Sequence, residues 1–335
     1  MGRLGNLWKT AIAGGAGVAA LAAVNAVIQR GVRDPDDSAL GGDAHFFHWR
    51  YGRVFYKAAG NSKPGIPIVF IHGIGAGYSS FMWRKNFDPL SADFRVLAVD
   101  LLGFGFSDKP VNVSYSPDLY VDLISDFIRE VAGGRANIIA SSLSASYAIR
   151  VAAEHPDLVN SMILNSPLPS VTQQSRPGMT GAAFYGLLQS PVLGTSFHNV
   201  MASERSIRDY AGTTMFYDAR RVTDRLVAHL YATSHQPGSQ HAVAAFLAGY
   251  LNTDVTESFA RLTQPVVMVC GKQDTTTPLA LPVALAKLNP NARVEVFDFC
   301  RMMPEQEHPL VFNQLVYESF GARAYAASVE TASED

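Results

Sequence analysis

One serine in this 335-residue chain has a position from which its hydroxyl could attack a substrate. Ser142 follows the apolar run Asn137–Ala140 and precedes the helical stretch 145–153. The pattern predicts a strand, a sharp turn and a helix with this serine at the apex. Such a turn lifts the hydroxyl above the sheet, and the first N–H groups of the helix stay free to receive negative charge. The residues two places on either side, Ala140 and Ser144, are small, so the turn and helix can pass the neighbouring strands. A match of only five residues also fits an ordinary turn.

Three further motifs lie at or after other apolar runs of the sequence, and their order along the chain can be compared with that of known families. They are Val69-Phe70-Ile71-His72-Gly73-Ile74-Gly75, Val99-Asp100-Leu101-Leu102-Gly103-Phe104-Gly105-Phe106-Ser107 and Gly271-Lys272-Gln273-Asp274. Together with the turn at Ser142, they resemble the α/β-hydrolase family over about residues 50–320. The resemblance implies an α/β-hydrolase fold of the capped type, with residues 169–262 as a helical lid.

The resemblance also implies roles for individual residues. Ser142 would be the nucleophile, and the backbone N–H groups of Leu143 and Ile74 would form an oxyanion hole. Each such donor typically stabilises the developing charge by about 2.7–4 kcal/mol. Asp274 falls where the family places the acid that orients the base, and a turn role ahead of Thr277 fits its position equally well. The pocket would also include His72, which we expect to shape its loop through backbone bonds, and Gly73, Ser141 and Met302.

The base is missing from its family position. The surrounding residues match the family, but Met302 stands where the histidine belongs; the matching residues are Pro304, Glu307, Pro309 and Asn313. A thioether has no proton to exchange, so Met302 cannot activate a serine. Loss of this imidazole in a serine protease costs about 10⁶ in turnover. Three alternatives stay open: His308, chemistry that needs no base, or a lid histidine such as His198, His235 or His241.

The elements that must position these residues alternate along the chain. Short apolar runs separated by helical stretches predict a mostly parallel sheet with helices on both faces. Residues 45–58 alternate apolar and polar side chains, which predicts a first antiparallel pair. The predicted organisation is an N-terminal helix over residues 1–33, a core over 44–168 and 263–322, a helical cap over 169–262, and a flexible tail over 323–335.

The N-terminal segment is unusually apolar. Residues 10–28 carry no charge and are rich in Ala, Gly and Val. As a helix they would span roughly 28 Å, about the thickness of the hydrocarbon core of a bilayer. This predicts an apolar helix that anchors the chain in a membrane; an export signal that is cleaved or an amphipathic surface helix fits as well. Basic residues are balanced on the two sides, so the orientation stays undetermined.

The composition of the chain gives no indication of a nucleic-acid partner, a metal or another cofactor. With 27 Lys and Arg against 29 Asp and Glu, the net charge is −2, and no basic tract indicates nucleic-acid binding. The two cysteines, Cys270 and Cys300, each end an apolar run and are expected as buried thiols. The nine histidines form no ligand spacing, so we expect neither a metal nor another cofactor.

Two classes of function fit these residues. The first is a serine hydrolase of a small apolar ester, thioester or amide, with an atypical or missing base. The second is an inactive member of the same fold that binds an apolar ligand or a protein partner, or that forms a subunit of a membrane complex. The retained Ser142, His72 and Asp274 favour the first, and Met302 favours the second.

Overall fold

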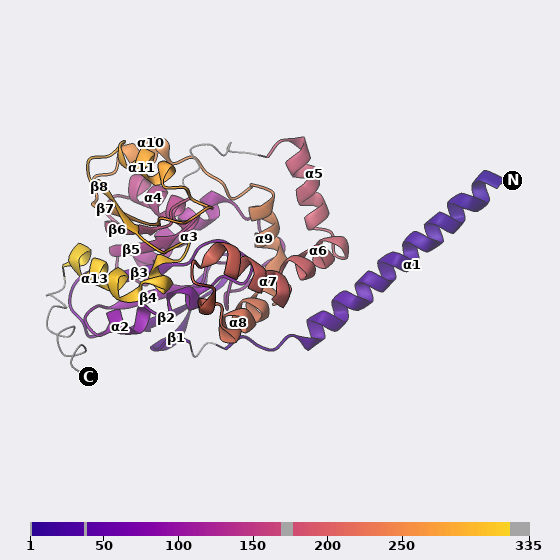
Figure 1. The fold of residues 1–335 in the computed structure, drawn as a ribbon, viewed down its shortest axis with the longest axis horizontal. Helices are drawn as coiled ribbons and strands as arrows, with labels where there is room; N and C mark the ends of the chain where they lie inside the picture. The colour runs from indigo at the N-terminus through magenta and orange to yellow at the C-terminus, as the bar shows by residue number, and fades with distance from the viewer. Residues whose placement is uncertain (1, 37–38, 169–176, 322–335) are drawn as a thin grey trace.

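The protein is described by a computed structural model that covers residues 2–36, 39–168 and 177–321, with side chains from residue 17 onward. Within these ranges, one eight-stranded sheet runs in the order β1-β2-β4-β3-β5-β6-β7-β8 (Figure 1). β2 pairs antiparallel with β1 and β4, and all other neighbours are parallel. The strands are β1 (Asp43–Trp49), β2 (Gly52–Ala59), β3 (Ile68–Ile71), β4 (Val96–Val99), β5 (Ala136–Ser141), β6 (Val159–Asn165), β7 (Val266–Gly271) and β8 (Ala292–Phe297).

Helices fill most of the connections between these strands. They are α1 (Gly2–Gly31), α2 (Phe87–Ser91), α3 (Pro117–Glu130), α4 (Ser144–Glu154), α5 (Met179–Leu188), α6 (Leu193–Met201), α7 (Glu204–Tyr210), α8 (Asp224–Ser234), α9 (Ser239–Leu247), α10 (Thr256–Ala260), α11 (Ala280–Ala286), α12 (Pro304–Glu307) and α13 (Pro309–Phe320). The predicted antiparallel pair at 45–58 is therefore β1 and β2.

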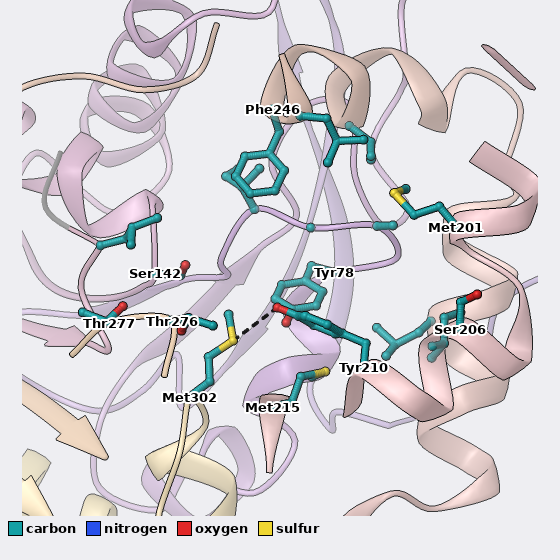
Figure 2. A pocket seen from close by; sticks show the side chains of 18 residues that line it. Tyr78, Ser142, Met201, Ser206, Tyr210, Met215, Phe246, Thr276, Thr277 and Met302 are labelled. Atoms are coloured by element: carbon teal, nitrogen blue, oxygen red, sulfur yellow. Dashed lines mark hydrogen bonds between the residues drawn. The ribbon is translucent and has the colours of Figure 1, made fainter. Parts of the chain in front are cut away.

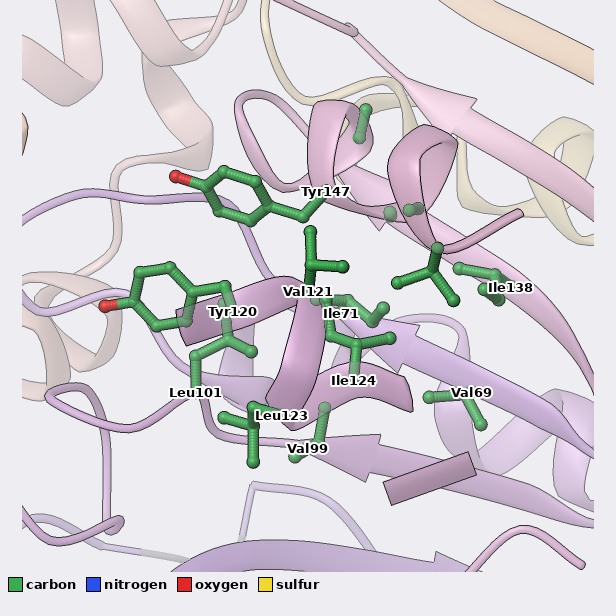
Figure 3. Packing of buried hydrophobic residues seen from close by; sticks show 14 of the residues in the cluster. Val69, Ile71, Val99, Leu101, Tyr120, Val121, Leu123, Ile124, Ile138 and Tyr147 are labelled. Carbon is green, nitrogen blue, oxygen red and sulfur yellow. The ribbon is translucent and has the colours of Figure 1, made fainter. Parts of the chain in front are cut away.

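The central strands bury side chains on both faces of the sheet. In β3, Val69 and Ile71 join the cluster that packs against α3 and α4 (Figure 3). Ile68 and Phe70 point the other way, into the cluster that includes residues of α2 and α13. Each fully buried side chain of this kind contributes about 1.5–3 kcal/mol. The predicted α/β fold, with a mostly parallel sheet and helices on both faces, is confirmed.

Local sequence features mark both ends of helix α3. The Ser116 side chain accepts a hydrogen bond from the Leu119 N–H at 3.2 Å, and Pro117 takes the first helical position. After the helix, Gly133 and Gly134 adopt φ of 92° and 89°, which a side chain would strain. These caps fix the helix that covers the strand preceding Ser142.

Between β6 and β7, the described residues 177–262 contain helices and no strand. This segment, which we call the cap, packs on the core through a buried cluster that joins Tyr78 and Phe81 to Met215, Phe216 and Leu230. The predicted limits of the cap and of the two core segments stay predictions, and residues 169–176 and the predicted tail at 323–335 lie outside the described residues.

Helix α1 extends away from the body of the protein, and its C-terminal half packs against α6 of the cap (Figure 1). The Asn25 side chain donates to the Val192 carbonyl at 3.1 Å and to the Ser196 hydroxyl at 3.0 Å, and it accepts from the Asn199 amide at 3.0 Å. Across the described part of the chain, no helix combines the length and apolarity needed to cross a membrane. The predicted anchor at residues 10–28 therefore finds no support there, and the side chains of its residues 10–16 lie outside the described ones.

Candidate active site

Ser142 lies at the sharp turn between β5 and α4, as the sequence predicts. Its φ is 54°, a left-handed conformation that few residues other than glycine adopt. The turn is held by a hydrogen bond from the Ser142 N–H to the Asn165 carbonyl at 2.9 Å and by one from the Ser144 hydroxyl to the His72 carbonyl at 2.7 Å. Such backbone strain persists where the surroundings enforce it and is typical of functional turns.

The Ser142 side chain lines a cavity of about 580 Å³ between the core and the cap (Figure 2). The lining carries no Lys, Arg, His, Asp or Glu among the residues that the structure describes. The lining residues are Ile74, Gly75, Ala76, Tyr78, Ser142, Leu168, Met201, Ser206, Ile207, Tyr210, Met215, Leu230, Val243, Phe246, Leu247, Thr276, Thr277 and Met302. The cavity is therefore apolar, with a few hydroxyl groups.

Two backbone N–H groups beside Ser142 are free to bind an oxygen. Neither the Ile74 N–H nor the Leu143 N–H donates a hydrogen bond to any other described group. The loop before Ile74 comes close to the turn, since a Cβ added to Gly73 would lie 3.1 Å from the Ser142 Cβ. A side chain at position 73 would therefore press on Ser142, and glycine permits the close approach. Ser141 is 6% exposed and ends β5 without lining the cavity.

His72 shapes this loop and carries no free nitrogen. Its Nε2 accepts from the Leu101 N–H at 3.0 Å, so Nδ1 carries the proton and donates to the Gly73 carbonyl at 2.7 Å. The ring is fully buried, and this burial lowers its pKa. The imidazole is neutral and bonded on both sides, in agreement with the loop-shaping role expected from the sequence.

Asp274 lies in the turn after β7 and is 6% exposed. Its Oδ1 accepts three hydrogen bonds, from the Thr276 N–H at 2.7 Å, the Thr276 hydroxyl at 2.6 Å and the Thr277 N–H at 3.2 Å. Its Oδ2 is buried and has no hydrogen-bond partner in the described part of the chain. Asp274 therefore stabilises the turn through Oδ1. Its Oδ2 can accept a hydrogen bond from another donor, which in a catalytic triad is an imidazole N–H.

Met302 occupies the wall of the cavity and is 8% exposed. Its sulfur accepts a hydrogen bond from the Tyr210 hydroxyl at 3.6 Å (Figure 2). The structure does not bring His308 to Ser142: its ring lines a separate cavity with Tyr217 and lies 3.4 Å from the Phe299 carbonyl. The structure therefore corrects the sequence alternative that made His308 the base, because the residue precedes α13 and its ring lies by the Phe299 carbonyl.

The three lid histidines also lie outside the cavity lining. His198 Nε2 lies 2.8 Å from the Ser234 carbonyl, and burial lowers the pKa of its ring to about 4. His235 Nδ1 lies 2.9 Å from the Tyr231 carbonyl, and His241 pairs with the Gln189 side chain. These partners give each ring a structural role. Among the described residues, no group of three or more His, Cys, Asp and Glu side chains is arranged to hold a metal ion.

Sequence reasoning missed two tyrosines and one acid. Tyr78 comes only four residues after Ile74, so the sequence offers a local signal for it, whereas Tyr210 comes from the cap and has none. Glu305 is buried behind the site, where its Oε2 accepts from the Asn165 amide at 2.5 Å. Burial raises the pKa of Glu305 from 4.5 to about 7. The folded state therefore binds this proton more tightly than the unfolded state, and its contribution to the free energy of unfolding falls as the pH rises between these values.

Comparison with known proteins agrees with this geometry. The family described as the alpha/beta hydrolase fold matches residues 66–306. The chain belongs to the α/β-hydrolase family. One relative within this family is the 2-hydroxymuconate semialdehyde hydrolase of Pseudomonas sp. (strain CF600), 26% identical over 278 residues, 80% of this chain and 91% of the relative.

Two further α/β-hydrolases extend the comparison. The 2-hydroxy-6-oxononadienedioate/2-hydroxy-6-oxononatrienedioate hydrolase of Cupriavidus pinatubonensis is 26% identical over 263 residues, 76% of this chain and 86% of the relative. The solved structure of the meta-cleavage product hydrolase CumD from Pseudomonas fluorescens matches with a TM-score of 0.66 and 26% identity, over 85% of this chain and 98% of its own. By name, these relatives are hydrolases of a semialdehyde, of a dienedioate and trienedioate, and of a meta-cleavage product, and none of these names is that of a simple ester.

Proposed function

We propose that this α/β-hydrolase cleaves an uncharged, largely apolar carbonyl compound by nucleophilic attack of Ser142. The N–H groups of Ile74 and Leu143 bind the carbonyl oxygen as it becomes negative. Asp274 is the acidic residue of the site. Met302, at the position predicted for the base, cannot serve as one. The scissile bond is that of an ester, thioester or amide, or a carbon–carbon bond next to a ketone as the meta-cleavage relatives suggest.

One observation carries this proposal: the strained Ser142 turn presents a hydroxyl to a cavity beside two free N–H groups. A scaffold or a binding wall has no need of left-handed backbone at a serine. Each donor contributes about 2.7–4 kcal/mol to a tetrahedral intermediate in enzymes of known mechanism. This stabilisation remains available in the absence of a base.

The charge of the cavity supports an uncharged substrate. The relatives named above include hydrolases of dienedioates, whose carboxylates require a cation or several hydrogen bonds when buried. No described residue that lines this cavity carries a charge. A carboxylate would therefore be desolvated there without compensation, whereas an apolar carbonyl compound would be bound by its hydrocarbon surface.

A fluorophosphonate probe tests the nucleophile, because it labels serines that are activated within an oxyanion hole. We expect slow labelling of the wild type and none of Ser142→Ala. The matched control Ser190→Ala, which changes a serine of the cap outside the cavity lining, should label like the wild type. Labelling that persists in Ser142→Ala, or a folded wild type that does not label, would refute the assignment.

A second candidate, an inactive binding protein, is favoured by one observation. No described histidine lines the cavity, and the sequence resemblance predicts the base at position 302, which is Met in this chain. In that case the protein would retain an apolar ligand without turning it over. Membrane association through residues 10–28 and a protein partner stay predictions from the sequence alone.

A further inference from the structure

Two tyrosines place hydroxyl groups in the cavity wall beside Met302. Tyr210 ends α7 of the cap, and Tyr78 lies in the loop between β3 and α2 (Figure 2). The Tyr78 ring packs against the oxyanion loop, since a Cβ added to Gly75 would lie 3.2 Å from it. The two rings therefore join the cap to the loop that holds the Ile74 N–H.

The Tyr210 hydroxyl has only a weak acceptor. It donates to the Met302 sulfur at 3.6 Å, and a thioether is among the poorest acceptors in proteins. A carbonyl or ester oxygen in the cavity would accept the same proton more strongly. The hydrogen bond to Met302 thus holds the Tyr210 hydroxyl in place and yields readily to a ligand.

The Tyr78 hydroxyl lies next to that of Tyr210 and has no well-formed hydrogen bond to any described residue. The Tyr78 side chain is 5% exposed, so the pair includes a buried hydroxyl that lacks a hydrogen-bond partner among the described residues. Burial raises the pKa of both tyrosines, and nearby Asp274 adds to this rise. Both groups therefore remain protonated donors at neutral pH.

We propose that Tyr210, supported by Tyr78, forms a second hydrogen-bonding subsite that binds an acceptor oxygen of the ligand. This inference rests on the proposed function, because the first oxygen of the ligand occupies the N–H groups of Ile74 and Leu143. The ligand class is then an uncharged molecule with two acceptor oxygens and an apolar remainder, such as an ester or a dicarbonyl compound. Tyr210 is its specificity-determining residue.

The test compares two ligands of nearly identical shape. Benzil carries two adjacent ketones, and deoxybenzoin has a methylene in place of one of them. Binding is measured by equilibrium dialysis in the Ser142→Ala protein, in which no covalent adduct with the serine can form. We expect benzil to bind more tightly, and Tyr210→Phe to weaken benzil about 2- to 10-fold, the value of one ordinary hydrogen bond, without affecting deoxybenzoin.

The matched control is Tyr217→Phe, which removes the hydroxyl of a tyrosine in the separate cavity near His308 and should leave both ligands unchanged. The proposal is overturned if Tyr210→Phe weakens both ligands equally or neither, or if benzil has no advantage to begin with. A thermal melt of Tyr210→Phe verifies that the variant is folded. Because this test measures binding and not turnover, a folded wild type that fluorophosphonate fails to label would refute the hydrolase and leave the subsite standing.

Discussion

Replacing Met302 by histidine should convert the site into a complete Ser-His-Asp triad. Three observations support this expectation. Met302 lines the same cavity as Ser142. The Asp274 Oδ2 is buried without a partner in the described structure, so it can accept the Nδ1–H of the new imidazole. The resemblance of the sequence to the family predicts the catalytic histidine at position 302, where this chain has Met.

The size of the effect follows from what the substitution adds and removes. A positioned general base typically accelerates such a reaction about 10²–10⁴-fold. The hydrogen bond to the carboxylate of Asp274 contributes about 1.5–3 kcal/mol to the folded state. Loss of the buried methionine costs a similar amount, about 1.5–3 kcal/mol. We therefore expect Met302→His to raise turnover 100-fold or more with little change in stability.

The assay is hydrolysis of p-nitrophenyl acetate with a thermal melt of the same samples. Met302→Gln is the matched control, because it introduces a polar side chain of similar size with no base. The activity of Met302→His should rise with pH through about 6.5, as the imidazole becomes neutral. Adding Asp274→Asn should abolish most of the gain. A folded Met302→His protein no faster than Met302→Gln would refute the reasoning.

Three further perturbations test other parts of the structure. Glu305→Gln should remove a pH-dependent contribution of about 3 kcal/mol to the free energy of unfolding, so that thermal stability no longer falls between pH 4.5 and 7. The control Glu257→Gln, at an exposed position, should leave that fall in place. Gly73→Ala should slow fluorophosphonate labelling about 10- to 100-fold by displacing the oxyanion loop, whereas Gly186→Ala, whose Cβ meets open space, should not. Asn25→Ala should cost about 1–3 kcal/mol of local stability and increase hydrogen exchange in α6; unchanged exchange would contradict the docking of α1.

Much of the fold could be predicted because its signals are local. Apolar runs of four to six residues, each followed by a turn, define the parallel strands, and Ser116 with Pro117 marks the start of α3. The turn at Ser142 is likewise encoded in adjacent residues. The contacts of Asp274 with Thr276 could be expected for the same reason, since the partners are two residues apart.

The rest of the site depends on contacts between segments far apart in the sequence. Tyr210 reaches Met302 across 92 positions, and no pattern around either residue announces the pairing. His308 is the reverse case: it is close in sequence to position 302, where the family histidine is expected, but its ring does not lie near Ser142. The chain direction at the start of α13 turns that ring toward Phe297 instead, at 5.8 Å between ring centroids.

The amide of Asn25 has a mechanical consequence. It ties the first helix to α6, and the last residue of α6, Met201, lines the cavity. A displacement of the first helix relative to the core would therefore also move α6, and with it the part of the cavity wall that Met201 forms.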